Sequence, residues 1–117
     1  MSLNKYTPEE DIIAKKKKQL EEFNLSERKK EIDDFKKVLS LPEGRRIMWK
    51  ILSDAGVFRT SFTGNSTTFF NEGKRDIGLL VLSGVNAAGL KYLTQMQEEF
   101  ANEQKIKTQK IGELNGR

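Results

Sequence analysis

The residues best suited to chemistry form a charged pattern that occurs twice. Residues 42–47 read Pro-Glu-Gly-Arg-Arg-Ile, and residues 71–76 read Asn-Glu-Gly-Lys-Arg-Asp. If each copy begins a helix, unpaired backbone N–H groups and basic side chains meet there, a combination that binds phosphate or another anion. In a structural interpretation, each glutamate instead bonds to an arginine across the two helix starts and to free backbone amides. We favour this second interpretation, because basic residues at a helix N-terminus otherwise oppose the macrodipole.

Basic side chains in and between the two copies are the candidate contacts for a nucleic acid. They are Arg45, Arg46, Arg59, Lys74 and Arg75. Contact through them would be with the phosphate backbone, so we expect weak DNA binding that falls steeply with salt. The net charge of +4 is spread along the chain, whereas nucleic-acid binders usually concentrate their excess charge. A DNA-associated accessory protein is therefore the alternative function.

Most catalytic and metal sites are excluded by residue type. The chain has no histidine and no cysteine, so it lacks the commonest general base, the commonest transition-metal ligand and any thiolate. The Ser- and Thr-rich residues 60–68 lack the Gly-Lys-Ser/Thr ending of a P-loop. Neighbouring carboxylates such as Glu98 and Glu99 diverge on a helix, so we predict no metal site. We expect a non-enzymatic protein without a cofactor or a small-molecule substrate.

Length and composition predict one small helical core with solvated extensions. The 117 residues are 36% hydrophobic and 32% charged, and this balance places part of the chain outside a core. The longest uncharged stretch, residues 77–90, is shorter than the roughly 20 apolar residues of a membrane span, so none is predicted. We predict an all-α fold of four to five helices around a central apolar helix. Its parts are charged N-terminal helices at 1–41, a helical core domain at 42–104 and an exposed or disordered tail at 105–117.

The N-terminal part is predicted to contain two helices with thin apolar faces. Thr7 caps the first, which ends near Phe23, and Ser26 caps the second, which ends before Pro42. Five apolar residues on these faces are too few for two helices to bury alone, so we predict that they face a partner. They are Ile12, Leu20, Phe23, Ile32 and Phe35.

The core part is predicted to hold helices at 42–55, 71–85 and 90–103. Gly56 should end the first of these in a left-handed C-cap. The predicted buried faces are Ile47, Ile51, Leu52 and Ala55; Ile77, Leu80, Val81 and Val85; and Leu90, Leu93, Met96 and Phe100. An ordered, phenylalanine-rich loop at 57–70 is expected to pack on these helices. Its predicted anchors are Trp49, Phe58, Phe62, Phe69 and Phe70.

The sequence from residue 42 to about residue 100 resembles a family of small tailed-phage and prophage proteins. The resemblance rests on Gly-Arg-Arg at 44–46, Gly-Val-Phe-Arg-Thr-Ser-Phe at 56–62 and Glu-Gly-Lys-Arg at 72–75, followed by Gly78. Members, typified by a small Bordetella podophage protein, are encoded among head and portal genes. The resemblance implies a virion or morphogenesis protein, located in the host cytoplasm or the virion. Its expected partner is another copy of itself or another virion or assembly protein.

Overall fold

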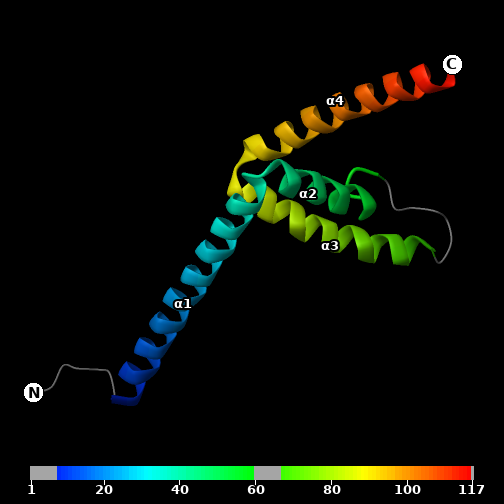
Figure 1. Cartoon of the computed structure of the whole chain (residues 1–117). Helices are drawn as coiled ribbons and strands as arrows, with labels where there is room; N and C mark the ends of the chain where they lie inside the picture. Colours follow the sequence, from blue (N-terminus) through cyan, green and yellow to red (C-terminus); the bar gives the residue numbers. More distant parts are fainter. Residues whose placement is uncertain (1–7, 60–66, 117) are drawn as a thin grey trace, which may run out of the picture. The chain divides into compact units, whose positions relative to one another are not determined.

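A computed structural model describes residues 8–59 and 67–116 of the chain, and in these residues it contains four helices and no strand (Figure 1). The helices are α1 (Pro8–Leu39), α2 (Pro42–Asp54), α3 (Thr67–Ala88) and α4 (Leu90–Asn115). The predicted all-α fold is therefore confirmed. The chain divides into two compact units, Met1–Glu31 and Ile32–Arg117. The second unit contains the hydrophobic core.

Helix α1 is one continuous helix of 32 residues, so the predicted break before Ser26 is wrong. No glycine or proline lies between Glu9 and Leu39, and a serine or asparagine inside a helix costs only a few tenths of a kcal/mol relative to good helix formers. Acidic residues in the first turn and Lys36 and Lys37 in the last turn match the helix macrodipole. The predicted cap at Thr7 lies outside the described residues.

The turn from α1 to α2 occurs where the sequence predicts it. Leu41, which precedes Pro42, has extended backbone angles (φ −102°, ψ 135°), as a residue before proline prefers. The two helices approach closely at Gly44, where an added Cβ would collide with the carbonyl group of Val38. The turn places Leu39, which is fully buried, at the centre of the second unit.

The C-terminus of α2 is a Schellman motif. Gly56 has the left-handed φ of 77° that the sequence predicts for a C-cap glycine. The Gly56 N–H donates to the carbonyl of Ser53 at 3.0 Å, and the Val57 N–H donates to that of Leu52 at 3.2 Å. Val57 and Leu52 are both buried, so this motif closes one end of the core.

The core is small and is shared by all four helices. Helices α2, α3 and α4 each contact the other two. The buried apolar residues are Leu39, Leu52, Val57, Val85, Ala88 and Met96. Two glycines of α3 make the close packing possible: Gly78 lies against Ala55 and Val57, and Gly84 lies against the ring of Phe35. Helix α3 therefore contacts the end of α1 as well as α2 and α4, which is the central position predicted for it.

Among the described residues, only one side of α3 is covered, and this overturns several predicted positions. The helix begins at Thr67, so Phe69 and Phe70 belong to it and are not loop anchors; they are 81% and 66% exposed. Ile77 and Leu80, predicted to be buried, are 65% and 74% exposed. The covered side carries Val85 and the partly buried Val81, as predicted, together with Gly78, Ala88 and the partly buried Leu82. The predicted anchor Phe62 lies outside the described residues.

Helix α2 is rotated relative to its predicted orientation. Leu52 is buried and Ala55 partly buried, as predicted, but Ile47 and Ile51 are exposed. Met48 and Trp49 take their place against the core. The physical reason is that Trp49 has aromatic partners on that side, whereas the predicted apolar stripe did not include it.

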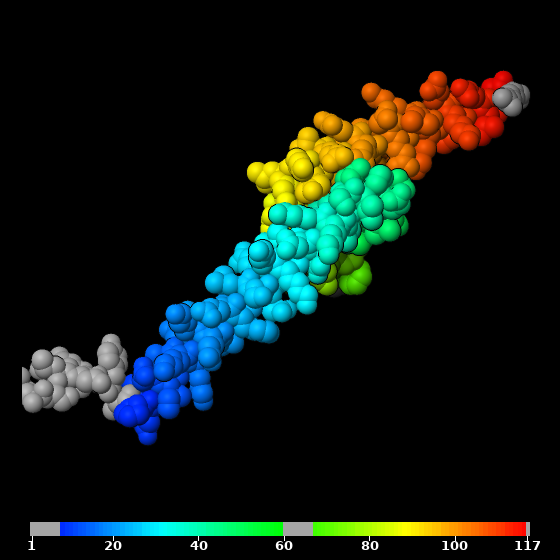
Figure 2. All heavy atoms as spheres, turned by 60° about the vertical axis from the view of Figure 1, so that its left-hand side comes forward, coloured from blue at the N-terminus to red at the C-terminus, as the bar shows by residue number. Residues whose placement is uncertain are grey.

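Helix α4 extends beyond its predicted end near residue 103, as far as Asn115. No glycine or proline interrupts residues 91–111, and Lys107 forms an i,i+4 ion pair with Glu103 at 3.7 Å. Met96 is buried and Leu93 partly buried, as predicted, whereas Leu90 is exposed. Residues 104–116 are exposed, and on the face shown in Figure 2 no other segment lies over them.

None of the described helices alone is long and apolar enough to cross a bilayer. The pair α3 and α4, bent by 112° between them, meets the length and composition criteria only together.

Candidate protein-binding surfaces

A groove of about 390 Å³ lies between α2 and α4 in the second unit. Trp49, Met96 and Phe100 form its apolar part. Its charged side chains come in two sets: Arg45, Arg46, Lys50 and Lys107 are basic, and Asp54, Glu99 and Glu103 are acidic. The two signs are nearly balanced, so the groove does not have the one-sided charge of an anion site.

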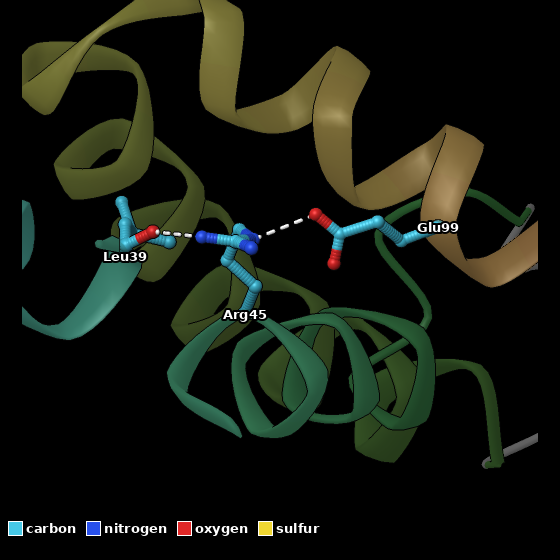
Figure 3. A network of polar contacts seen from close by, with 3 residues as sticks. All are labelled: Leu39, Arg45 and Glu99. Atoms are coloured by element: carbon cyan, nitrogen blue, oxygen red, sulfur yellow. Dashed lines mark hydrogen bonds and ion pairs between the residues drawn. The ribbon is translucent and has the colours of Figure 1, made fainter. Parts of the chain in front are cut away.

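Arg45 connects three helices inside this groove (Figure 3). Its Nε donates to Oε1 of Glu99 on α4 at 2.8 Å, and its Nη1 donates to the carbonyl oxygen of Leu39, the last residue of α1, at 2.9 Å. The Arg45 side chain is only 11% exposed. Arg45 is therefore held by contacts within the protein, but its carboxylate partner is Glu99 and not Glu43 or Glu72, the partners considered in the structural interpretation of the sequence.

Trp49 is the aromatic centre of the same region. Its ring stacks on Phe58 with centroids 5.1 Å apart, and it meets Phe100 at 5.4 Å with the planes tilted by 36°. Such pairs contribute about 0.5–1.5 kcal/mol beyond their buried area. The Trp49 indole nitrogen is buried without a hydrogen-bond partner. Trp49 and Phe58 therefore do hold the chain after α2 against the helices, as expected, and Phe100 is an additional partner on α4.

The five basic residues predicted to contact an anion do not form one surface. Helices α2 and α3 run antiparallel (Figure 1), so the two charged patterns lie at opposite ends of the pair, roughly one α2 length or about 20 Å apart. Arg45 is paired as described above, Arg59 donates to the carbonyl of Ser53 at 3.2 Å, and Lys74 lies over the ring of Phe70 at 5.2 Å. Arg46 has no ion-pair partner among the described residues, and the Nε of Arg75 is buried without a hydrogen bond.

The second unit carries an exposed apolar stripe on α3 that sequence analysis missed. At 100° per residue, Phe69, Phe70, Ile77 and Leu80 fall within an arc of about 100°, and all four are exposed. Gly73 lies in the same arc, with no atom within 4 Å of the position of a Cβ. We call Phe69, Phe70, Gly73, Ile77 and Leu80 the α3 stripe. The sequence signal was present, since this helix is apolar almost all round, but the sequence does not say which side is covered.

The first unit carries a second exposed apolar surface, on α1. Ile12, Ile13, Leu20 and Phe23 are 52–65% exposed and again lie within an arc of about 100°. We call these four residues the α1 stripe. Two residues predicted to face a partner with them belong to the second unit: Ile32 is partly buried, and Phe35 packs on Gly84. Phe35 is therefore a core residue, because the glycine leaves room for its ring.

Among the described residues there is no group of three or more Asp, Glu, His or Cys side chains that could hold a metal ion.

The fold and these surfaces define a small all-α protein with a compact core and exposed apolar faces. Residues 35–98, more than half of the chain, match the family model described as Bbp19-like phage protein. The chain belongs to this family, and the resemblance to a phage protein family is confirmed. The matched segment contains all six buried core residues. Neither curated proteins nor solved structures gave a match.

Proposed function

We propose that this member of the Bbp19-like phage proteins is a virion or morphogenesis protein that acts by binding other proteins and catalyses no reaction. The observation that carries the proposal is the α3 stripe, four large apolar side chains exposed on one face of the helix at the centre of the fold. Burying a large apolar side chain contributes about 1.5–3 kcal/mol, so covering the stripe would contribute on the order of 5 kcal/mol before the costs of association.

The kind of partner that fits this stripe is suggested by the chain's own packing. Gly84 lies on the same face of α3, one turn beyond Leu80. A helix of this chain already packs there, because Phe35 of α1 lies against the bare backbone of Gly84. Gly73 stands three turns earlier on that face and has no neighbour within 4 Å. A partner helix that inserts a large apolar side chain at Gly73 would repeat the packing of Phe35 on Gly84 along Ile77 and Leu80.

A non-enzymatic role is supported by the residue types. The chain has neither histidine nor cysteine. Arg45 in the groove already donates its hydrogen bonds to Glu99 and to the Leu39 carbonyl. The alternative, DNA binding through phosphate contacts, has no comparable support, because its five basic residues are divided between two ends of a helix pair. It stays a prediction from the sequence.

We propose the host cytoplasm during assembly, or the finished virion, as the place of action. The test is to induce the phage or prophage that encodes this chain and to analyse purified particles and particle precursors by quantitative mass spectrometry. The proposal expects the chain to copurify with particles or precursors in a fixed ratio to a structural protein. A chain found only free of every particle form, with particles assembling normally after its gene is deleted, would contradict the proposal.

A further inference from the structure

Two charged residues lie on the same face of α1 as the α1 stripe: Lys16 within the stripe and Glu27 one turn beyond its last residue, Phe23. Lys16 and Glu27 lie within the same arc of the helix as Ile12, Ile13, Leu20 and Phe23. Lys16 precedes Leu20 by four residues, and Glu27 follows Phe23 by four residues. Neither Lys16 nor Glu27 makes an ion pair with any residue in the described part of the chain.

From this arrangement we infer that α1 binds the α1 of a second copy in the antiparallel direction, with the crossing point between Glu21 and Glu22. In this register, residues whose numbers add up to 43 lie opposite each other. Leu20 then packs on Phe23 of the second copy, and Phe23 on its Leu20. On each side of these apolar layers, Lys16 of one copy faces Glu27 of the other.

The ends of the stripe fit the same register. Ile13 lies opposite Lys30, and Ile12 lies opposite Glu31, so the aliphatic stems of these charged residues can cover the isoleucines while the charges reach water. Of the other pairs at this sum of 43, Lys17 with Ser26 and Gln19 with Asn24 bring no like charges together, whereas Glu9 with Asp34, at the outer ends of the same arc, does. Lys15 with Arg28 and Glu21 with Glu22 are also like-charged, but they lie on the sides of α1 that face away from the seam.

A parallel pair is disfavoured by the same two charges. In a parallel, in-register pair, Lys16 would face Lys16 and Glu27 would face Glu27 inside the apolar seam, and like charges opposed in an interface destabilise it. Polar residues within an apolar helical seam are known to fix register and orientation. Lys16 and Glu27 therefore select the antiparallel arrangement.

The inference rests on the proposed function in that it names a second copy of the chain as one of the protein partners. It does not depend on the α3 stripe, because it concerns α1. Its test is sedimentation equilibrium of the full chain and of charge-reversed variants. The wild-type chain should form dimers, and Lys16→Glu and Glu27→Lys should each raise the dimer dissociation constant about tenfold or more. The double variant Lys16→Glu/Glu27→Lys should return to within about threefold of the wild type.

The comparison of the dissociation constant of the double variant with those of the single variants is decisive. Residues 16 and 27 are 11 positions apart, about 16 Å along one helix, so they cannot pair within a chain. Recovery by the double variant therefore requires contact between two copies. In a parallel dimer every variant, single or double, would still oppose like charges at positions 16 and 27, so the single variants would not be weakened and there would be no loss for the double variant to recover.

A matched control is Lys18→Glu, which makes the same charge change on the opposite side of α1 and should leave the dissociation constant unchanged. Circular dichroism checks that every variant keeps its helix content. A monomeric wild-type chain, a double variant as weak as the single ones, or an equal effect of Lys18→Glu would overturn the inference. None of these results would contradict the proposed function, because a chain that is monomeric in solution could still copurify with phage particles.

Discussion

The packing of α3 on the end of α2 makes a sharp prediction at Gly78. A Cβ added to Gly78 would lie 2.6 Å from the Cβ of Ala55 and 2.6 Å from a methyl group of Val57, well inside ordinary contact distance. The Ala55 Cβ is fixed to its backbone, and Val57 is buried, so neither atom can move away without shifting the Schellman turn. Overpacking of this kind costs about 1–3 kcal/mol. Alanine regains about 1 kcal/mol of helix propensity over glycine.

We therefore expect Gly78→Ala to lower the free energy of unfolding by up to about 2 kcal/mol. Gly73→Ala on the same helix is the matched control, because its Cβ meets nothing within 4 Å; it should raise the free energy of unfolding by up to about 1 kcal/mol. For a chain of this length, Gly78→Ala should have a Tm below that of Gly73→Ala by up to about 12 °C. Thermal unfolding followed by circular dichroism measures this. Equal stabilisation by both substitutions would refute the packing of α3 on α2.

The remaining predictions concern the arginines of the groove between α2 and α4 and the phenylalanines at positions 58 and 69. Arg45→Ala should lower the free energy of unfolding by about 2–3 kcal/mol, because it removes the donor to a charged partner and to the end of α1. Glu99→Ala, at a more exposed side chain, should lower the free energy of unfolding by about 1 kcal/mol. Arg46→Ala should stay within about 0.5 kcal/mol, and urea unfolding of the three variants checks this order. Phe58→Ala should cost about 1–2 kcal/mol and change the fluorescence of the single tryptophan. Phe69→Ala should neither lower the free energy of unfolding by this amount nor change the tryptophan fluorescence. Equal effects of Phe58→Ala and Phe69→Ala would contradict the assignment of Phe69 to the exposed stripe.

The sequence predicted the features that depend on local chemistry. The break before Pro42 follows from steric restriction of the preceding residue, and the end of α2 at Gly56 follows from the freedom of glycine at positive φ. The all-α class and the central position of the fourth predicted helix, α3, followed from the apolar pattern. The phage family followed from a long ordered motif within residues 44–78.

The sequence could not predict which side of an apolar helix is covered. Ile77 and Leu80 are as apolar as Val85, so periodicity alone placed all three on one buried face. The buried side is decided by Gly78 and Gly84, whose missing side chains admit Ala55, Val57 and Phe35. Such a close approach depends on residues far apart in the chain.

The partner of Arg45 was missed for a similar reason. Glu99 is 54 positions away from it, and the repeated Glu-Gly-basic pattern drew attention to Glu43 and Glu72 instead. The repeated pattern suggested that two helix starts lie side by side, whereas the antiparallel packing of α2 and α3 places the two copies of the pattern at opposite ends of this helix pair. The break predicted at Ser26 failed because a capping residue only ends a helix when the following residues cannot continue it.

The α3 stripe is tested most directly by complementation of a phage whose copy of this gene has been deleted. The complementing genes encode the wild-type chain, Leu80→Lys, Ile77→Lys, or Asn86→Lys as a control at an exposed polar position outside the stripe. All four proteins should fold with the same Tm within a few degrees, because the substituted side chains are exposed. If the stripe binds a partner, Leu80→Lys and Ile77→Lys should give infectious titres at least about tenfold below the wild type, and Asn86→Lys should match it. Full titres with both lysine variants in the stripe would contradict the proposed function of this surface.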